Sequence, residues 1–505
     1  MDQNTPKQVE LIFNATKLQG GTSQQDPYLK IFFIDNENTY KELGETEFQK
    51  RDPNPKWVKS FKMDFIFQRR QNLRFEVWDK NTISSDKLIG TAEATLSQIM
   101  ADQTNNLKLS LTDQKNNHVG DLFCRAGNVG TNCVQWTWEG IKLKNMDTFS
   151  KSDPLMRLWY KGDNETYVYI KETEVIMDNN DPKWKRFETS LNLLCKNDLN
   201  RQFYIEVKDW EQSGNYKFIG EAYVSLAWII QNPNALIELK DKGKINGHLK
   251  CSDVKLVKPE FIDFLMGGQQ INIISAIDYT ASNGEYTDPN SLHCADLSRN
   301  QYLTTLKAVC DVLLDFDQDK KISMYGFGGV PEFPNFKKYD TDHCFPVTGN
   351  PNNAEVGGVD GIVQTYLDSL KYVTLCGPTL FSEIIQKSME YAKKQQDNNV
   401  YTILLILTDG VIDDLQESKI LLSQAGELPF SVVIVGIGND KFTSMKELDG
   451  PDVKEMTDVQ YKRDCCNFIR FADYKKDSKK LLEQILAEIP QQLTTYKKQH
   501  KQFVR

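Results

Sequence analysis

The sequence lacks the patterns that mark a secreted, disulfide-bonded or membrane-spanning protein. Its ten cysteines are scattered through 505 residues without one C-x-x-C pair. This usage favours reduced thiols in a cytosolic compartment over a disulfide framework or a zinc site. No apolar run approaches the roughly 18 residues of a transmembrane helix, and the opening MDQNTPKQVE has no signal-peptide layout. We therefore expect a soluble, unsecreted protein of the cytoplasm.

Basic residues are fewer than acidic ones, and histidine is rare. Lys and Arg number 61 against 70 Asp and Glu, a formal net charge of −9, which disfavours nonspecific binding to nucleic acid. The negative charge does not exclude binding to a membrane through bound cations. The five histidines show no zinc-protease spacing. We interpret His293-Cys294 as a buried cysteine beside a surface histidine, in preference to a metal or nucleophile pair.

The stretch INIISAIDYTASNG, at 271–284, is typical of a buried strand that stops at an acid. Residues 271–277 form the near-continuous apolar run expected of a strand covered on both faces. Asp278, Thr280 and Ser282 then follow at alternate positions. Three oxygen side chains on alternate residues of a tight loop can turn to one point, as a hard divalent cation requires.

Two further segments supply oxygen side chains to the same predicted sheet edge. A second buried-type strand, YTILLIL at 401–407, is followed by Asp409, and a third apolar strand comes at 431–436. Thr379 precedes a helical pattern over 381–393. Open α/β sheets bind ligands at the carboxyl ends of their strands. Asp409 and Thr379 are therefore expected to join the first three side chains.

This arrangement resembles the von Willebrand factor A domain, an α/β doubly wound (Rossmann-like) fold with a metal-ion-dependent adhesion site. The resemblance implies that two acids and three hydroxyls hold one magnesium or manganese ion. It also implies that a carboxylate of a partner protein can complete the octahedron. The five matching positions are Asp278, Thr280, Ser282, Thr379 and Asp409.

The first half of the chain repeats itself. Asp26-Pro27 recurs as Asp153-Pro154, 127 residues later (153 − 26), and the string PKW recurs at the same offset, at 55 and 182. The strings LIG and FIG, at 88 and 218, are 130 residues apart (218 − 88). Short strand-like segments separated by turn-rich stretches predict β-sandwiches. Matching landmarks in one order indicate a duplicated domain.

These landmarks resemble the C2 domain, an eight-stranded β-sandwich whose end loops bind calcium through five acids. Lys217 stands where the second copy should have its fifth acid, and Gly20 and Asn81 replace two acids of the first copy. The calcium-binding acids that the resemblance implies are Asp147, Asp153, Asp209 and Glu211 in the second copy and Asp26, Asp79 and Asp86 in the first.

We expect calcium at the second copy and weak or phosphate-assisted binding at the first, with solvated acids that have no metal role as the alternative at both. Phe149, in the first loop of the second copy, is predicted to contact the membrane headgroup region. A phenylalanine packed into the core is the alternative interpretation.

Two C2 domains followed by an adhesion-type A domain is the order of the copine family, and strings such as DYTASNG at 278 and YGFG at 325 resemble copine sequence. We place the domains at 1–116, 117–256 and 257–505, with the first boundary in the polar run 112–120. The resemblance implies that the protein is not an enzyme. It implies a calcium-dependent phospholipid-binding protein of the cytoplasm that docks on anionic membranes when calcium rises and recruits partner proteins through its A domain. The alternative is a metal-dependent hydrolase or phosphotransferase using the Asp278 site, for which no general base is evident.

Overall fold

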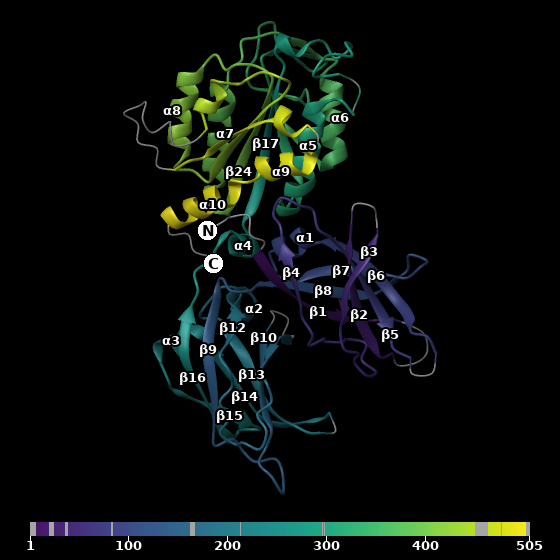
Figure 1. The fold of residues 1–505 in the computed structure, drawn as a ribbon, viewed down its shortest axis with the longest axis vertical. Coiled ribbons are helices and arrows are strands. Elements are labelled where there is room, and N and C mark those ends of the chain that lie inside the picture. The colour runs from purple at the N-terminus through teal and green to yellow at the C-terminus, as the bar shows by residue number, and fades with distance from the viewer. Residues whose placement is uncertain are drawn as a thin grey trace. The chain divides into compact units, whose positions relative to one another are not determined.

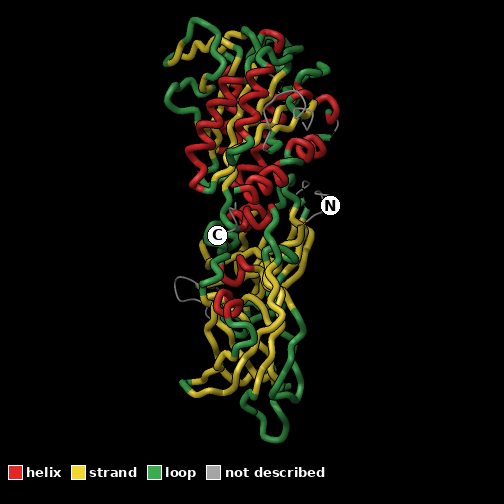
Figure 2. The backbone as a smooth tube through the Cα atoms, turned by 90° about the vertical axis from the view of Figure 1, so that its left-hand side faces the viewer, coloured by secondary structure: helices red, strands yellow, loops and turns green. Residues whose placement is uncertain are grey.

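The computed structural model describes residues 7–19, 25–35, 39–81, 84–161, 167–212, 214–294, 296, 298–449, 463–475 and 477–500. These residues fall into two compact units, one mainly of residues up to 267 and the other mainly of residues from 268 onward. The first unit holds two β-sandwiches and the second an α/β domain. Strands dominate the first unit and helices are concentrated in the second (Figure 2).

The first sandwich arranges its described strands in the order β3-β2-β5-β6-β7-β8-β1-β4 (Figure 1). On β5 the buried residues Leu73, Phe75 and Val77 alternate with more exposed ones, because successive side chains of a strand point to opposite faces. Its elements are β1 (Lys7–Thr16), β2 (Pro27–Ile34), β3 (Tyr40–Glu45), β4 (Phe61–Phe65), β5 (Asn72–Asp79), β6 (Lys87–Thr95), α1 (Leu96–Ala101), β7 (Leu107–Thr112) and β8 (His118–Asn128).

The second sandwich repeats the first strand for strand. Its described strands have the order β11-β10-β13-β14-β15-β16-β9-β12, so each strand number is eight higher than its counterpart. Its elements are β9 (Cys133–Ile141), β10 (Pro154–Lys161), β11 (Tyr167–Glu172), β12 (Phe187–Ser190), α2 (Leu191–Cys195), β13 (Gln202–Trp210), β14 (Tyr216–Ser225), α3 (Leu226–Gln231), β15 (Leu236–Asp241) and β16 (Lys244–Leu256). The predicted duplication is confirmed.

The repeated landmarks have one structural cause. Trp57 and Trp184 are buried, and their indole N–H groups donate to the carbonyls of Pro27 at 3.2 Å and Pro154 at 3.4 Å. Each indole thus satisfies its donor at the start of a strand, as a buried tryptophan must. The strings DP and PKW recur together because they form this contact.

The boundary predicted between the two copies is wrong. Residues 118–128 form β8, which pairs with β1 and β7 in the first sheet. The polar run 112–120 contains the turn between β7 and β8, in which the N–H of Asp113 donates to the carbonyl of Asn117 at 3.0 Å. Hairpin turns and linkers share the same polar residues. The chain passes between the two sheets at residues 129–132.

The α/β domain is built on a mixed sheet with the described order β21-β18-β17-β24-β25-β26, and β22 also pairs with β18. The strands from β18 to β26 in this order run parallel, whereas β21 and β22 are antiparallel to β18. The three predicted strands are β17 (Gln270–Asp278), β24 (Val400–Thr408) and β25 (Phe430–Gly436). Every residue of β24 and β25 is buried, which explains their continuous apolar runs.

Helices flank this sheet, with α7 and α8 on one side of the central strands and α5 and α6 on the other (Figure 1). Helix α7 (Ser382–Gln395), predicted over 381–393, packs Ile384 and Ile385 into a core with Leu404 of β24. None of the described helices is long and apolar enough to cross a bilayer. The remaining elements are α4 (Phe261–Met266, in the first unit), α5 (Gln301–Leu313), β18 (Lys321–Phe327), β19 (Gly329–Phe333), β20 (Phe336–Lys337), β21 (Phe345–Pro346), β22 (Glu355–Gly357), α6 (Gly358–Ser369), β23 (Val373–Leu375), α8 (Leu415–Ala425), β26 (Cys466–Arg470), α9 (Ser478–Ile485) and α10 (Ile489–Gln499).

Candidate functional site

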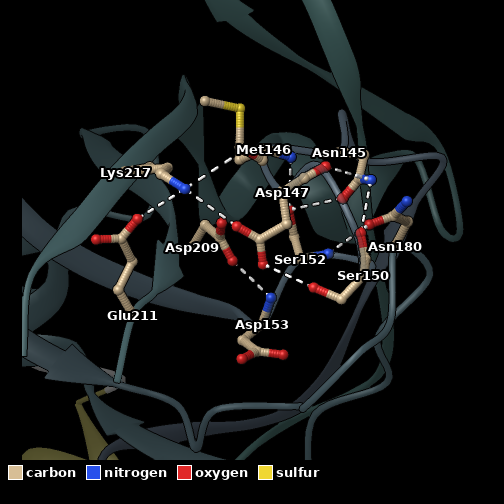
Figure 3. A network of polar contacts seen from close by, with 10 residues as sticks. All are labelled: Asn145, Met146, Asp147, Ser150, Ser152, Asp153, Asn180, Asp209, Glu211 and Lys217. Carbon is tan, nitrogen blue, oxygen red and sulfur yellow. Dashed lines mark hydrogen bonds and ion pairs between the residues drawn. The ribbon is translucent and has the colours of Figure 1, made fainter. Parts of the chain in front are cut away.

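The second sandwich fixes two of its predicted acids with backbone hydrogen bonds. Asp153 directly precedes β10, and Asp209 lies in β13 opposite Pro154. The N–H of Asp153 donates to Oδ1 of Asp209 at 2.6 Å (Figure 3). The N–H of Asp178 donates to Oδ1 of Asp153 at 2.6 Å. Both carboxylates are therefore held in place before any ligand arrives.

Asp209 has a buried oxygen that is left over. The residue is 0% exposed, and its Oδ2 has no hydrogen-bond partner among the described residues. Burial, and then the charge of Asp147, raise the pKa of the Asp209 carboxyl. A buried, unpartnered carboxylate oxygen is costly, and a bound cation would remove that cost. The site thus fits calcium, which takes carboxylate and carbonyl oxygens.

Lys217 lies beside the other two predicted acids of this copy, Asp147 and Glu211. We call the four acids Asp147, Asp153, Asp209 and Glu211 together the cage. Its Nζ lies 3.0 Å from Oδ1 of Asp147 and 2.7 Å from Oε1 of Glu211 (Figure 3). The contact with Glu211, and after it the contact with Asp147, raises the pKa of the Lys217 ammonium. Within the part of the chain that the structure describes, no three His, Cys, Asp or Glu side chains are gathered as a metal cluster. The four predicted acids are divided between an ammonium group and backbone donors.

The loop that carries Asp147 is braced from within. The hydroxyl of Ser152 accepts the N–H of Met146 at 2.9 Å, and the amide of Asn145 donates to the carbonyl of Ser150 at 2.9 Å. The side chain of Asn180 accepts the N–H of Ser152 at 3.2 Å (Figure 3). The loop therefore presents its acids from a fixed backbone.

The tip of the same loop carries a fully exposed aromatic ring. Phe149 is 102% exposed, so the core-packed interpretation is wrong, and Met177 on the neighbouring loop is 60% exposed. The two loops are tied together, because the N–H of Lys151 donates to Oδ1 of Asp178 at 2.7 Å. Sequence reasoning missed Met177, although a methionine beside Asp178-Asn179-Asn180 is an unusual residue for a polar turn.

The first sandwich repeats part of this arrangement, with its acids more fully engaged. The N–H of Asp26 donates to Oδ1 of Asp79 at 2.8 Å, as in the second copy. Asp86 accepts the N–H of Asn81 at 2.9 Å, the hydroxyl of Tyr28 at 2.7 Å and the ammonium of Lys80 at 3.0 Å. These donors, led by the Asn81 N–H, lower the pKa of Asp86 to about 2. Gly20 lies outside the described residues.

In the α/β domain, four of the five predicted metal ligands meet at the carboxyl ends of β17 and β24. Oδ1 of Asp409 accepts hydrogen bonds from Ser282 at 2.9 Å and Thr280 at 3.5 Å. Oδ2 of the buried Asp278 accepts the Thr408 hydroxyl at 2.6 Å and lies 3.4 Å from the Asp409 N–H. Burial raises the pKa of Asp278, and burial followed by the Asp278 charge raises the pKa of Asp409 to about 7.

The fifth predicted ligand, Thr379, lies against the loop that follows Asp409. A Cβ added to Gly410 would stand 3.3 Å from Oγ1 of Thr379. The N–H of Thr379 donates to Asp413 at 2.9 Å, which ties the two loops together. Two carboxylates and three hydroxyls are the oxygen donors that magnesium or manganese prefers, so the residues fit such an ion.

Several side chains that support this site were missed from the sequence. The amide of Asn283 donates to Oδ1 of Asp409 at 3.1 Å, and the hydroxyl of Tyr302 donates to Oδ1 of Asn283 at 2.6 Å. Asp414 accepts the N–H of Phe381 at 3.0 Å. The acids that follow Asp409 in TDGVIDD were a visible signal for such loop anchors.

The surface position expected for His293 is wrong. The ring is 0% exposed, its Nε2 donates to the carbonyl of Asp278 at 2.8 Å, and its Nδ1 lies 2.8 Å from the hydroxyl of Tyr366. Burial lowers the pKa of His293 to about 4, so the ring is neutral at pH 7. Cys294 is buried, and each of the ten cysteines is a free thiol.

Comparison with known proteins divides the chain in the same way. The C2 domain family matches residues 9–111 and 134–239, and the Copine family matches residues 291–504. Among solved structures, "BON1-C2B" is 21% identical over 24% of this chain and 90% of that chain, with a TM-score of 0.22. A calcium-bound structure of the two C2 domains of extended synaptotagmin 2 is 15% identical over 50% of this chain and 100% of that chain, with a TM-score of 0.20.

TM-scores this low carry no argument about function, so the assignment depends on the family matches and on the repeated sheet order. Those matches follow one another along the chain without overlap. With two C2 domains followed by a copine domain, the chain has the architecture of the copine family and is a member of it.

Proposed function

We propose that this copine is a calcium-dependent phospholipid-binding protein that docks on anionic membranes through its C2 domains and recruits partner proteins through a metal-bearing A domain. The observation that carries the proposal is the buried, unpartnered Oδ2 of Asp209. This oxygen belongs to the cage, and the first loop of the cage carries the fully exposed Phe149 at its tip.

The acids of the second copy would do the work of calcium-controlled docking. Asp153 and Asp209 would hold the ion, and without it the cage repels lipid phosphate through its negative charge. Calcium, when bound, supplies positive charge and coordination positions that phosphate oxygens can fill. Phe149 and Met177 then enter the headgroup region, where large apolar side chains lose contact with water.

The first copy is proposed as the weaker partner in docking. Tyr28 and Lys80 already satisfy Asp86, so a cation at that carboxylate would have to displace protein donors. Asp26 and Asp79 keep the arrangement seen in the second copy. This copy would therefore bind calcium weakly, or bind it with help from a phosphate group.

The α/β domain is proposed to be of the von Willebrand factor A type and to recruit protein partners for signalling. Asp278, Asp409 and the hydroxyls of Thr280, Ser282 and Thr379 would hold magnesium or manganese there. Such an ion, when bound, offers a coordination position to a carboxylate from a partner. The neutral hydroxyls leave the ion's charge only partly compensated, which favours an acidic side chain as the ligand that completes its shell.

The hydrolase alternative gains no support from the surroundings of Asp278. His293 is the histidine beside this residue, and both its ring nitrogens are engaged at 2.8 Å inside the protein. A general base must instead reach the proton it abstracts. We therefore retain the binding function.

The test is co-sedimentation of the full chain with phosphatidylserine vesicles, in calcium and in chelator. Wild type should pellet in calcium, and Asp209→Asn should pellet less because it removes one charge and weakens the buried ligand. Asp253→Asn is the matched control, since it removes the same charge from an exposed position on β16. Equal pelleting of wild type in calcium and in chelator would overturn the proposed function.

A further inference from the structure

The position of Lys217 in the second C2 cage is fixed by the backbone. Lys217 is in β14 and pairs directly with Asp209 of β13 in the antiparallel register. Its side chain is 40% exposed and reaches Asp147 of the first loop at 3.0 Å and Glu211 of the third loop at 2.7 Å. The Met146 carbonyl lies 3.5 Å from the same nitrogen. One ammonium group therefore bridges two loops that carry predicted calcium ligands.

The cage is divided into two halves by this contact. Asp147 and Glu211 form the half that contains the ammonium group (Figure 3). Asp153 and Asp209 form the other half, where backbone N–H groups hold one oxygen of each and Oδ2 of Asp209 has no partner among the described residues. The ammonium group binds carboxylate oxygens that a second calcium ion would need as ligands. The Asp209 half still has a buried carboxylate oxygen that can bind a first ion.

Charge counting supports the same division. Four carboxylates and one ammonium leave the cage with three negative charges, and one divalent ion lowers this to a single negative charge. Five carboxylates, the set implied by the resemblance to C2 domains, reach the same single charge only with two divalent ions. Like charges repel each other, so a cage with three negative charges repels an anionic membrane. A cage whose charge is reduced to a single negative charge can approach it.

We propose that Lys217 is a resident cation of the second C2 domain, which takes the place of a second calcium ion between Asp147 and Glu211. The cage then takes one calcium ion, at Asp153 and Asp209. This inference rests on the proposed function, because it assumes that the second copy binds calcium. It adds that the ammonium group is already present in chelator, so the calcium-free cage repels lipid phosphate less than four uncompensated carboxylates would.

The test is a calorimetric titration of the full chain with calcium alone. Lys217→Asp restores the fifth acid and should bind one more calcium ion per chain than wild type. Lys217→Met releases Asp147 and Glu211 without adding a carboxylate and should also gain an ion, at higher calcium. Lys183→Asp is the matched control, because Lys183 forms an exposed 3.0 Å ion pair with Glu139 of the same domain and should leave the number of ions unchanged.

The outcomes separate this inference from the proposed function. If wild type binds calcium but both folded Lys217 variants bind the same number of ions as wild type, Lys217 does not take the place of an ion and the inference fails alone. If wild type binds no calcium and pellets equally in calcium and in chelator, the proposed function fails and the inference fails with it. Pelleting in chelator gives a second reading, since Lys217→Met should pellet less than wild type.

Discussion

Replacing Phe149 by alanine should weaken calcium-dependent vesicle binding without lowering the stability of the fold. The side chain is 102% exposed, so it has no packing contacts to lose, and its whole apolar surface is available to a membrane. Fully burying a phenylalanine contributes about 1.5–3 kcal/mol. At about 1.4 kcal/mol per factor of ten in affinity, the variant should bind vesicles roughly tenfold to a hundredfold more weakly.

The assay is a titration of the full chain with phosphatidylserine vesicles at saturating calcium, paired with calorimetric melts. Tyr339→Ala is the matched control, because Tyr339 is 96% exposed in the α/β domain and should leave vesicle affinity unchanged. Equal affinities for the two variants would refute the membrane role of Phe149. A lower melting temperature for Phe149→Ala would refute the claim that the side chain only projects into solvent.

Three further predictions concern other sites. Met177→Ala should weaken vesicle binding by a smaller factor than Phe149→Ala, because Met177 is only 60% exposed; a larger effect would contradict this ranking. Asp278→Asn should abolish the rise in melting temperature that magnesium gives the full chain, and equal shifts in both proteins would exclude a metal at Asp278. Burial raises the pKa of Asp263 from 3.8 to about 7. Between these values the folded chain holds a proton that the unfolded chain has lost, so the free energy of unfolding falls as pH rises, by up to about 1.4 kcal/mol per pH unit. Melts at pH 5 and pH 8 should show a smaller loss in Asp263→Asn than in wild type, because Asp409 still contributes to it in both proteins, and parallel losses would argue against the role of Asp263.

The sequence predicted the elements whose cause is local. Strands β17, β24 and β25 are covered on both faces, so their apolar runs identified them and placed Asp278 and Asp409 at one sheet edge. The repeat of the two sandwiches was visible because Trp57 and Trp184 make the same contact. The domain boundary was missed because the turn between β7 and β8 has the composition of a linker.

Contacts between distant segments could not be read in advance. His293 contacts Asp278 and Tyr366, which are 15 and 73 residues away in the chain, and nothing near His293 indicates its burial. The resemblance to C2 domains placed Lys217 at an acid position, but its ion pair with Asp147 spans 70 residues. The exposure of Phe149 likewise depends on the path of a braced loop, which composition does not specify.

The most direct test of the account is a calcium titration of vesicle binding by the full chain, with Asp209→Asn and Asp79→Asn measured beside wild type. These two acids occupy equivalent positions, because each accepts a backbone N–H from the aspartate before the paired strand, at 2.6 Å and 2.8 Å. We predict that Asp209→Asn moves the midpoint to higher calcium by much more than Asp79→Asn. A larger shift for Asp79→Asn would contradict the dominance of the second copy, and vesicle binding that does not depend on calcium in wild type would contradict the account as a whole.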